Sequence, residues 1–148
     1  MLIDNLKIIF NRDLNKLKDE INLYKSEPTL WQTEKEITNS AGNLCLHLVG
    51  NLNTFLGAVF GKTDYVRQRE LEFSQKNIPK TTLVKMIDET ISMVNLALDN
   101  ITEDQLQEEY PIEVFPQKIS TELFLIHLAT HLTYHLGQIN YHRRLLDN

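Results

Sequence analysis

The sequence has few cysteines, no cluster of positive charge and no long apolar run, and each absence excludes a class of protein. It contains a single cysteine, Cys45, which excludes an internal disulfide and fits a reducing cytoplasm. Its net charge is -5, and it lacks the clustered Lys and Arg with which nucleic-acid-binding proteins neutralise phosphates. No apolar run is suited to a signal peptide or a transmembrane span. We therefore expect a cytoplasmic protein with no nucleic-acid or membrane partner.

Motifs for several kinds of catalysis are also missing. The sequence has no glycine-rich phosphate loop, no dinucleotide-binding fingerprint and no Ser-His-Asp order that supports a catalytic triad. Cys45 precedes His47 by two residues, which places the two side chains on nearly opposite sides of a helix. We interpret Cys45 as a small core residue and not as a nucleophile or a ligand.

Apolar residues recur at intervals of three and four in four long stretches, which predicts four amphipathic helices. The predicted helices cover residues 2–24, 39–60, 79–100 and 120–146. The connection after the second helix is too long for a tight hairpin and could cross the length of a bundle. We expect one all-α domain over residues 1–148, folded as a four-helix bundle.

The segments between these helices predict less regular structure. Residues 102–105 have the spacing of a capping box and predict a short helical turn. Residues 110–118 contain two prolines and predict a loop with a little extended structure. We interpret "RQRELEF" at 67–73 as a solvated loop, or else as a pocket rim that holds an anionic substrate group. Its charged residues are Arg67, Arg69, Glu70 and Glu72.

Four of the five histidines lie on the last predicted helix. In helical projection, His127, His135, Gln138 and His142 fall within about 40° of His131 and form one stripe. No charged residue occurs between Leu123 and His142, although a solvent-exposed helix face normally collects Lys and Glu. The stripe therefore resembles the polar lining of a bundle interior. Buried imidazoles need partners for their nitrogens, and one divalent cation satisfies several of them.

The second predicted helix carries a matching stripe of uncharged polar residues around His47, including Asn43, Asn51 and Thr54. Facing stripes would bring His47 to the pair His131 and His135, whose i, i+4 spacing lets both bind one ion. Three neutral histidines with an open position are typical of catalytic zinc. Nickel, cobalt, iron or manganese can use the same ligands.

Periodicity alone does not separate a metal site from a hydrogen-bonded or solvated helix face. The predicted metal ligands are His47, His131 and His135. The candidates for orienting a ligand imidazole or a bound molecule are Asn51, His127 and Gln138. For Asn51 and Gln138 the alternative is ordinary polar packing, and His142 is interpreted as a bystander because three ligands suffice.

Two segments, "NLCLHLVGNL" at 43–52 and "HLTYHLGQINYHRR" at 131–144, resemble the DinB/YfiT-like superfamily of metal-dependent enzymes. That family has a histidine on its second helix and a His-x-x-x-His-x-Gly-Gln motif on its fourth. The matching residues are His47, His131, His135, Gly137 and Gln138. "RQRELEF" is similar to a segment between helices 2 and 3 in one branch of the family. Leu136 replaces a frequent arginine, which puts in doubt any substrate contact made by that arginine.

The resemblance implies up-down-down-up connectivity, a divalent metal held by the three histidines, and a homodimer. Zinc or nickel is expected, and iron or manganese is an alternative. Some members of the superfamily are thiol transferases that use bacillithiol, mycothiol or glutathione. For this chain the resemblance implies a metal-dependent thiol S-transferase that conjugates a low-molecular-weight thiol to an electrophile.

Three other functions remain open at this point. A metal-dependent hydrolase could use the same ligands, although no carboxylate in the helix stripes offers itself as a general base. A metal-binding or stress-response protein without catalysis would have a saturated coordination sphere. Haem ligation by facing histidines in a bundle is the third.

Overall fold

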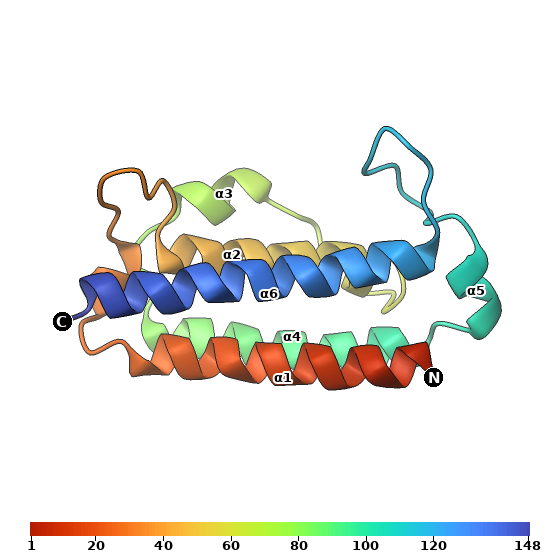
Figure 1. The fold of residues 1–148 in the computed structure, drawn as a ribbon, viewed down its shortest axis with the longest axis horizontal. Helices are drawn as coiled ribbons and strands as arrows, with labels where there is room; N and C mark the ends of the chain where they lie inside the picture. The colour runs from red at the N-terminus through yellow and green to blue at the C-terminus, as the bar shows by residue number, and fades with distance from the viewer.

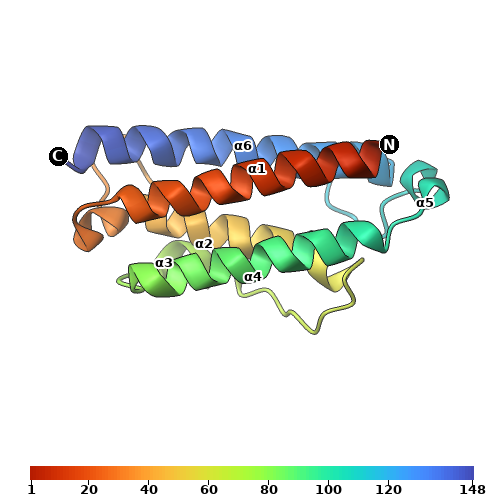
Figure 2. The same cartoon turned by 90° about the horizontal axis from the view of Figure 1, so that it is seen from below.

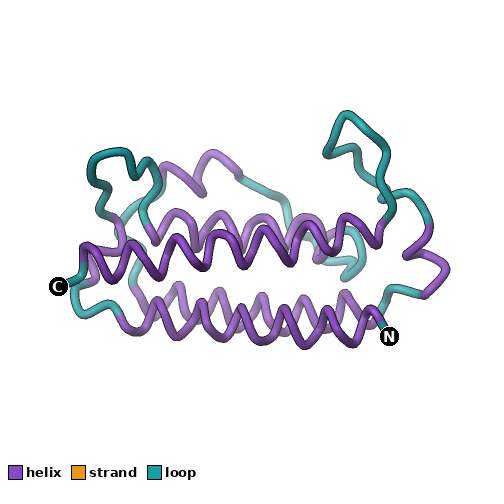
Figure 3. Tube along the Cα trace, viewed as in Figure 1, coloured by secondary structure: helices purple, strands orange, loops and turns teal.

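The computed structural model describes residues 1–148 and is built almost entirely from helices (Figure 3). The four long helices are α1 (Leu2–Leu23), α2 (Ala41–Leu52), α4 (Lys80–Asp99) and α6 (Thr121–Leu146). The shorter elements are the 3-10 helix η1 (Glu27–Trp31), the π-helix η2 (Asn53–Ala58), and the α-helices α3 (Arg69–Ser74) and α5 (Glu103–Gln107). The only strand-like pairing is an isolated bridge between Glu109 and Ser120, which closes the predicted two-proline loop. The all-α prediction is confirmed.

The long helices form a bundle in which α1 and α6 run in one direction and α2 and α4 run in the other (Figures 1 and 2). Helix α1 packs against α4 and α6, and α2 packs against the same two helices. This is the up-down-down-up order. Because α2 and α4 are parallel, the chain must return along the bundle between them, and α3 lies on this return path against α2 (Figure 1).

Side-chain caps fix the starts of α2, α5 and α6. The Ser40 side chain accepts a hydrogen bond from the Asn43 backbone at the start of α2, and Ser120 caps α6 in the same way. The capping box between Thr102 and Gln105 is present at α5. The second predicted helix differs in one respect, since its last part is the π-helix η2 and not a continuation of α2.

The core is one cluster of 31 buried apolar residues contributed by all four long helices. All 12 residues of α2 are buried, because α3 covers the side of α2 that faces away from the bundle. Cys45 is fully buried, as predicted for a core residue. None of the helices combines the length and the hydropathy that a membrane-spanning segment requires.

Candidate metal centre

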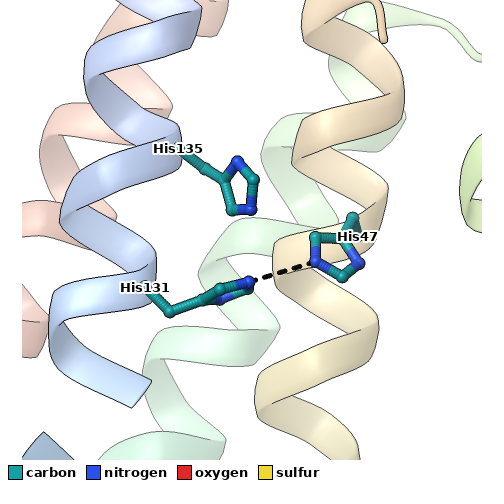
Figure 4. A group of neighbouring side chains, drawn as sticks. All are labelled: His47, His131 and His135. Atoms are coloured by element: carbon teal, nitrogen blue, oxygen red, sulfur yellow. Dashed lines mark hydrogen bonds between the residues drawn. The ribbon is translucent and has the colours of Figure 1, made fainter. Parts of the chain in front are cut away.

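Three of the five histidines converge between α2 and α6. His131 and His135 project from α6 toward His47 on α2 (Figure 4). One ligand atom from each residue can be chosen such that all three lie within 4.8 Å of one another. The Nε2 atoms of His47 and His131 are 3.2 Å apart. The predicted meeting of the two histidine stripes is confirmed.

The arrangement fits a divalent cation. Nitrogen ligands about 2.0–2.1 Å from a tetrahedral metal lie about 3.3 Å from each other, close to the spacing of the His47 and His131 Nε2 atoms. The His135 ring plane is nearly perpendicular to both other rings, at 89° to His47 and 86° to His131. His47 is buried, whereas His131 and His135 are half-buried. The cluster is therefore largely enclosed, and its α6 side reaches solvent.

Burial keeps the α6 histidines neutral. It lowers the pKa of His131 to about 4, and repulsion from His135 and His47 acts in the same direction. Burial also lowers the pKa of His135, although a hydrogen bond to Gln138 opposes this effect. Neutral imidazole is the form that binds a metal, so near neutral pH these two side chains have a lone pair available without losing a proton.

A buried carboxylate orients the third histidine. His47 donates from Nδ1 to Glu72 Oε1 over 3.1 Å, which leaves the lone pair on Nε2 directed at the other two histidines. Arg67 donates to both carboxylate oxygens of Glu72, each over 2.9 Å. Burial raises the pKa of Glu72, but its bonds to His47 and Arg67 outweigh burial and leave this pKa below its usual value. A carboxylate in this position fixes the tautomer of a metal-binding histidine.

The backbone of α2 makes room for this carboxylate. A Cβ atom at Gly50 would lie 1.9 Å from Glu72 Oε2, so only glycine allows the approach. Asn43 Nδ2 donates to the backbone carbonyls of Glu72 (2.9 Å) and Gln75 (2.8 Å), which holds α3 against α2. The geometry of His47 therefore depends on two contacts between α3 and α2.

The interpretation of residues 67–73 as a solvated loop is wrong in two respects: most of the segment belongs to helix α3, and two of its charged residues are withdrawn from solvent. Glu72 is 5% exposed and Arg67 is half-buried, whereas Arg69 and Glu70 are exposed. The alternative, a rim that holds an anionic group, does not describe Arg67 either, because Glu72 occupies its guanidinium. Gly50, a glycine inside the buried helix α2, was the one sequence signal for a close approach at this place.

Comparison with known proteins supports a single family over nearly the whole chain. Residues 3–148 match the model of a family described as a protein of unknown function, DUF1572. The chain belongs to the DUF1572 family. None of the curated proteins matches it. This DUF1572 protein has the fold of a conserved protein from Enterococcus faecalis, whose crystal structure aligns with a TM-score of 0.77 at 16% identity over 97% of this chain and 95% of that one.

Two residues of the DUF1572 chain that were predicted to orient a ligand lie at different distances from the cluster. Gln138 accepts a hydrogen bond from His135 Nδ1 over 2.7 Å, which leaves His135 Nε2 free. The His127 ring packs against Phe115 and Phe124, and its centroid is 6.0 Å from that of His131. It therefore lies beside the cluster and not within it.

Two buried polar atoms near the centre have no hydrogen-bond partner in the protein: Asn51 Oδ1 and His131 Nδ1. Unpaired buried polar atoms are costly, and a functional site is one of the places where they occur. His142 is different, since its Nδ1 accepts from the Tyr24 hydroxyl over 2.7 Å and its Nε2 donates to the Gln32 carbonyl over 2.8 Å. Both nitrogens of His142 are thus used to join α6 to the end of α1 and the segment that follows it.

Proposed function

We propose that this DUF1572 protein binds one divalent transition metal through His47, His131 and His135 and is a metal-dependent thiol S-transferase. The observation that carries the proposal is the convergence of three imidazoles, with the Nε2 atoms of His47 and His131 3.2 Å apart and the Nδ1 of His47 held by buried Glu72. The resemblance to the DinB/YfiT-like superfamily supports zinc or nickel as the metal and a low-molecular-weight thiol as the first substrate.

Some residues of the site would bind the metal, and others orient the imidazoles that bind it. A bound metal would supply an open coordination position and the positive charge that stabilises a thiolate. Glu72 orients His47, and Gln138 orients His135, so two of the three imidazoles are fixed in advance by hydrogen bonds. The low pKa of His131 leaves its imidazole neutral near neutral pH, which is the form that binds a metal.

The structure gives no support to metal-dependent hydrolysis through a carboxylate base. Glu72 is the carboxylate that contacts the cluster, and it binds Nδ1 of His47, whereas Nε2 of the same ring faces His131. A general base must lie within hydrogen-bond reach of the attacking water, and Glu72 lies behind the His47 ring. Thiol transfer needs no such base, because a thiol bound to a metal loses its proton outright.

Elemental analysis of protein purified without chelator tests the metal site. We expect about one equivalent of a transition metal in the wild type and its loss in His131→Ala. His127→Ala, which removes an imidazole from the same helix outside the cluster, is the matched control and keeps its metal. An equal metal content in all three proteins would overturn the assignment of the ligands.

The transferase reaction has its own test. Metal-loaded protein is incubated with a haloaromatic electrophile and, in turn, bacillithiol, mycothiol and glutathione, and the thioether product is measured. We expect product with at least one thiol, and none with His131→Ala. If the metal-loaded wild type makes no product with any of the three, the transferase proposal fails while metal binding stands.

A further inference from the structure

A cavity of about 480 Å³ lies beside the candidate metal centre, between α6 and the segment that leads into α2. Its volume falls within the range of roughly 300–1,000 Å³ that small-molecule sites occupy. Apolar and aromatic side chains form much of its wall: Ile37, Leu44, Tyr134, Tyr141 and Leu145. His135 and Gln138, which are hydrogen-bonded to each other, form the part nearest the centre. Mostly apolar walls with a few polar groups are typical of a ligand site.

We propose that this cavity binds a neutral, partly aromatic small molecule, and that this molecule is the electrophilic substrate of the site. The second part rests on the proposed function, whereas the first depends only on the cavity. The Tyr134 ring lies 5.3 Å from the His135 ring at 74°, so an aromatic surface continues from the cavity wall to a candidate metal ligand.

The charges around the cavity select against an anion. Glu36 is the only side chain with a formal charge among the lining residues, and no Lys or Arg lines the cavity. Arg144 stacks 5.1 Å from the Tyr141 ring centroid but is not one of the lining residues. In the metal-free protein an anionic ligand would therefore meet a carboxylate and no cationic partner. A neutral ligand avoids this repulsion and gains from burying its apolar surface.

The position of the cavity suits the transfer step. A molecule against the exposed side of His135 lies next to the ring whose Nε2 belongs to the three-histidine cluster. The cavity reaches the cluster through His135, which is the only one of the three histidines among its lining residues. In the reaction, the sulfur of the thiolate would form a bond to the electrophilic carbon. The leaving group would depart from that carbon with the bonding electron pair, and the proton of the thiol would already have gone to solvent. Orientation of the two reactants in adjoining sites is itself a source of rate enhancement.

Binding of two probes of matched shape tests the cavity. Neutral 2-naphthol and anionic 2-naphthoate are titrated into metal-free ¹⁵N-labelled protein, and amide chemical shifts give both the location and the Kd. We expect 2-naphthol to shift residues 36–39 and 134–145 and to bind at least tenfold more tightly than 2-naphthoate. Leu145→Glu should weaken 2-naphthol binding at least tenfold, because it adds a charge at a cavity wall whose native residue is 62% exposed.

The matched control is Leu123→Glu, on the same helix, where leucine is 51% exposed and lines a separate hollow beside His127. This variant should bind 2-naphthol as the wild type does. Shifts centred elsewhere, equal affinity for the two probes, or equal effects of the two Glu variants would each overturn the cavity proposal.

Two further measurements test ligand binding in the cavity separately from the transfer reaction. The 2-naphthol titration is repeated on His131→Ala, whose altered residue does not line the cavity. Unchanged binding of 2-naphthol to His131→Ala would show that the cavity proposal holds even if the metal proposal fails. In the transfer assay, 2-naphthol should inhibit competitively against the electrophile and not against the thiol. Competition against the thiol alone would overturn the assignment of the cavity to the electrophile.

Discussion

Glu72 is the residue on which the orientation of His47 depends, and its charge is matched by Arg67. We predict that Glu72→Gln lowers zinc affinity by roughly 10- to 100-fold, because a neutral amide holds the imidazole less firmly and makes Nε2 a weaker donor. Competition titration with a chromophoric chelator measures the change. Glu70→Gln, at an exposed position on the same short helix, should keep the wild-type affinity. Equal affinities in both variants would contradict this role of Glu72.

His131 should make the stability of the metal-free protein depend on pH. Its pKa is about 4 in the folded state, whereas an imidazole in an unfolded chain titrates near about 6.5. Between these values the unfolded chain binds more protons, so the free energy of unfolding must fall as the pH is lowered through this window. Urea denaturation between neutral pH and pH 4 should show this fall.

Replacement of the imidazole tests the cause of this pH dependence. His131→Gln should make the free energy of unfolding less sensitive to pH in the same window, because one depressed pKa has been removed. His127→Gln, half-buried outside the cluster, is the comparison and should change this pH dependence less than His131→Gln does. An unchanged pH dependence in His131→Gln would show that other groups cause it.

At the scale of elements, the Asn43 amide and the Glu72 carboxylate tie α3 to α2 by hydrogen bonds, and the Phe73 ring packs against His47. Asn43→Ala removes two hydrogen bonds to backbone carbonyls of this segment and leaves those carbonyls partly buried without partners. We predict a loss of about 1–3 kcal/mol in the free energy of unfolding and faster amide hydrogen exchange across residues 69–74. Gln75→Ala is the control, since it keeps the carbonyl and changes only an exposed side chain. Wild-type exchange in Asn43→Ala would show that α3 is held by other contacts.

The long helices and the short helix differ in what the sequence reveals of them. The four long helices and the three facing histidines were predictable, because periodic apolar residues and i, i+4 spacing are local properties of a helix. Helix α3 has six residues, too few for a period to be recognised, and its place is set by contacts with Gly50 and Asn43 of another helix. The roles of Glu72 and Arg67 depend on that tertiary placement, and no local pattern in the sequence reveals them.

At the scale of the whole molecule, metal binding should stabilise the bundle, because the three ligands come from two different helices. An ion that binds only the folded state adds about 2.7 kcal/mol at a hundredfold excess over its Kd, and in a domain of this size that raises the Tm by about 5–10 °C. Differential scanning calorimetry with and without zinc measures the shift. His47→Ala should show no shift, and an equal shift in this variant would place the binding elsewhere.

The order of the helices along the chain has a consequence for how the protein matures in the cell. His47 and His131 are 84 residues apart, and α6 is translated after the other three long helices. A nascent chain that has exposed only α1, α2 and α4 carries one ligand of the three and has no site to chelate an ion. At the proposed site, loading would therefore wait until α6 has left the ribosome and docked, so the metal would bind after translation and not during it.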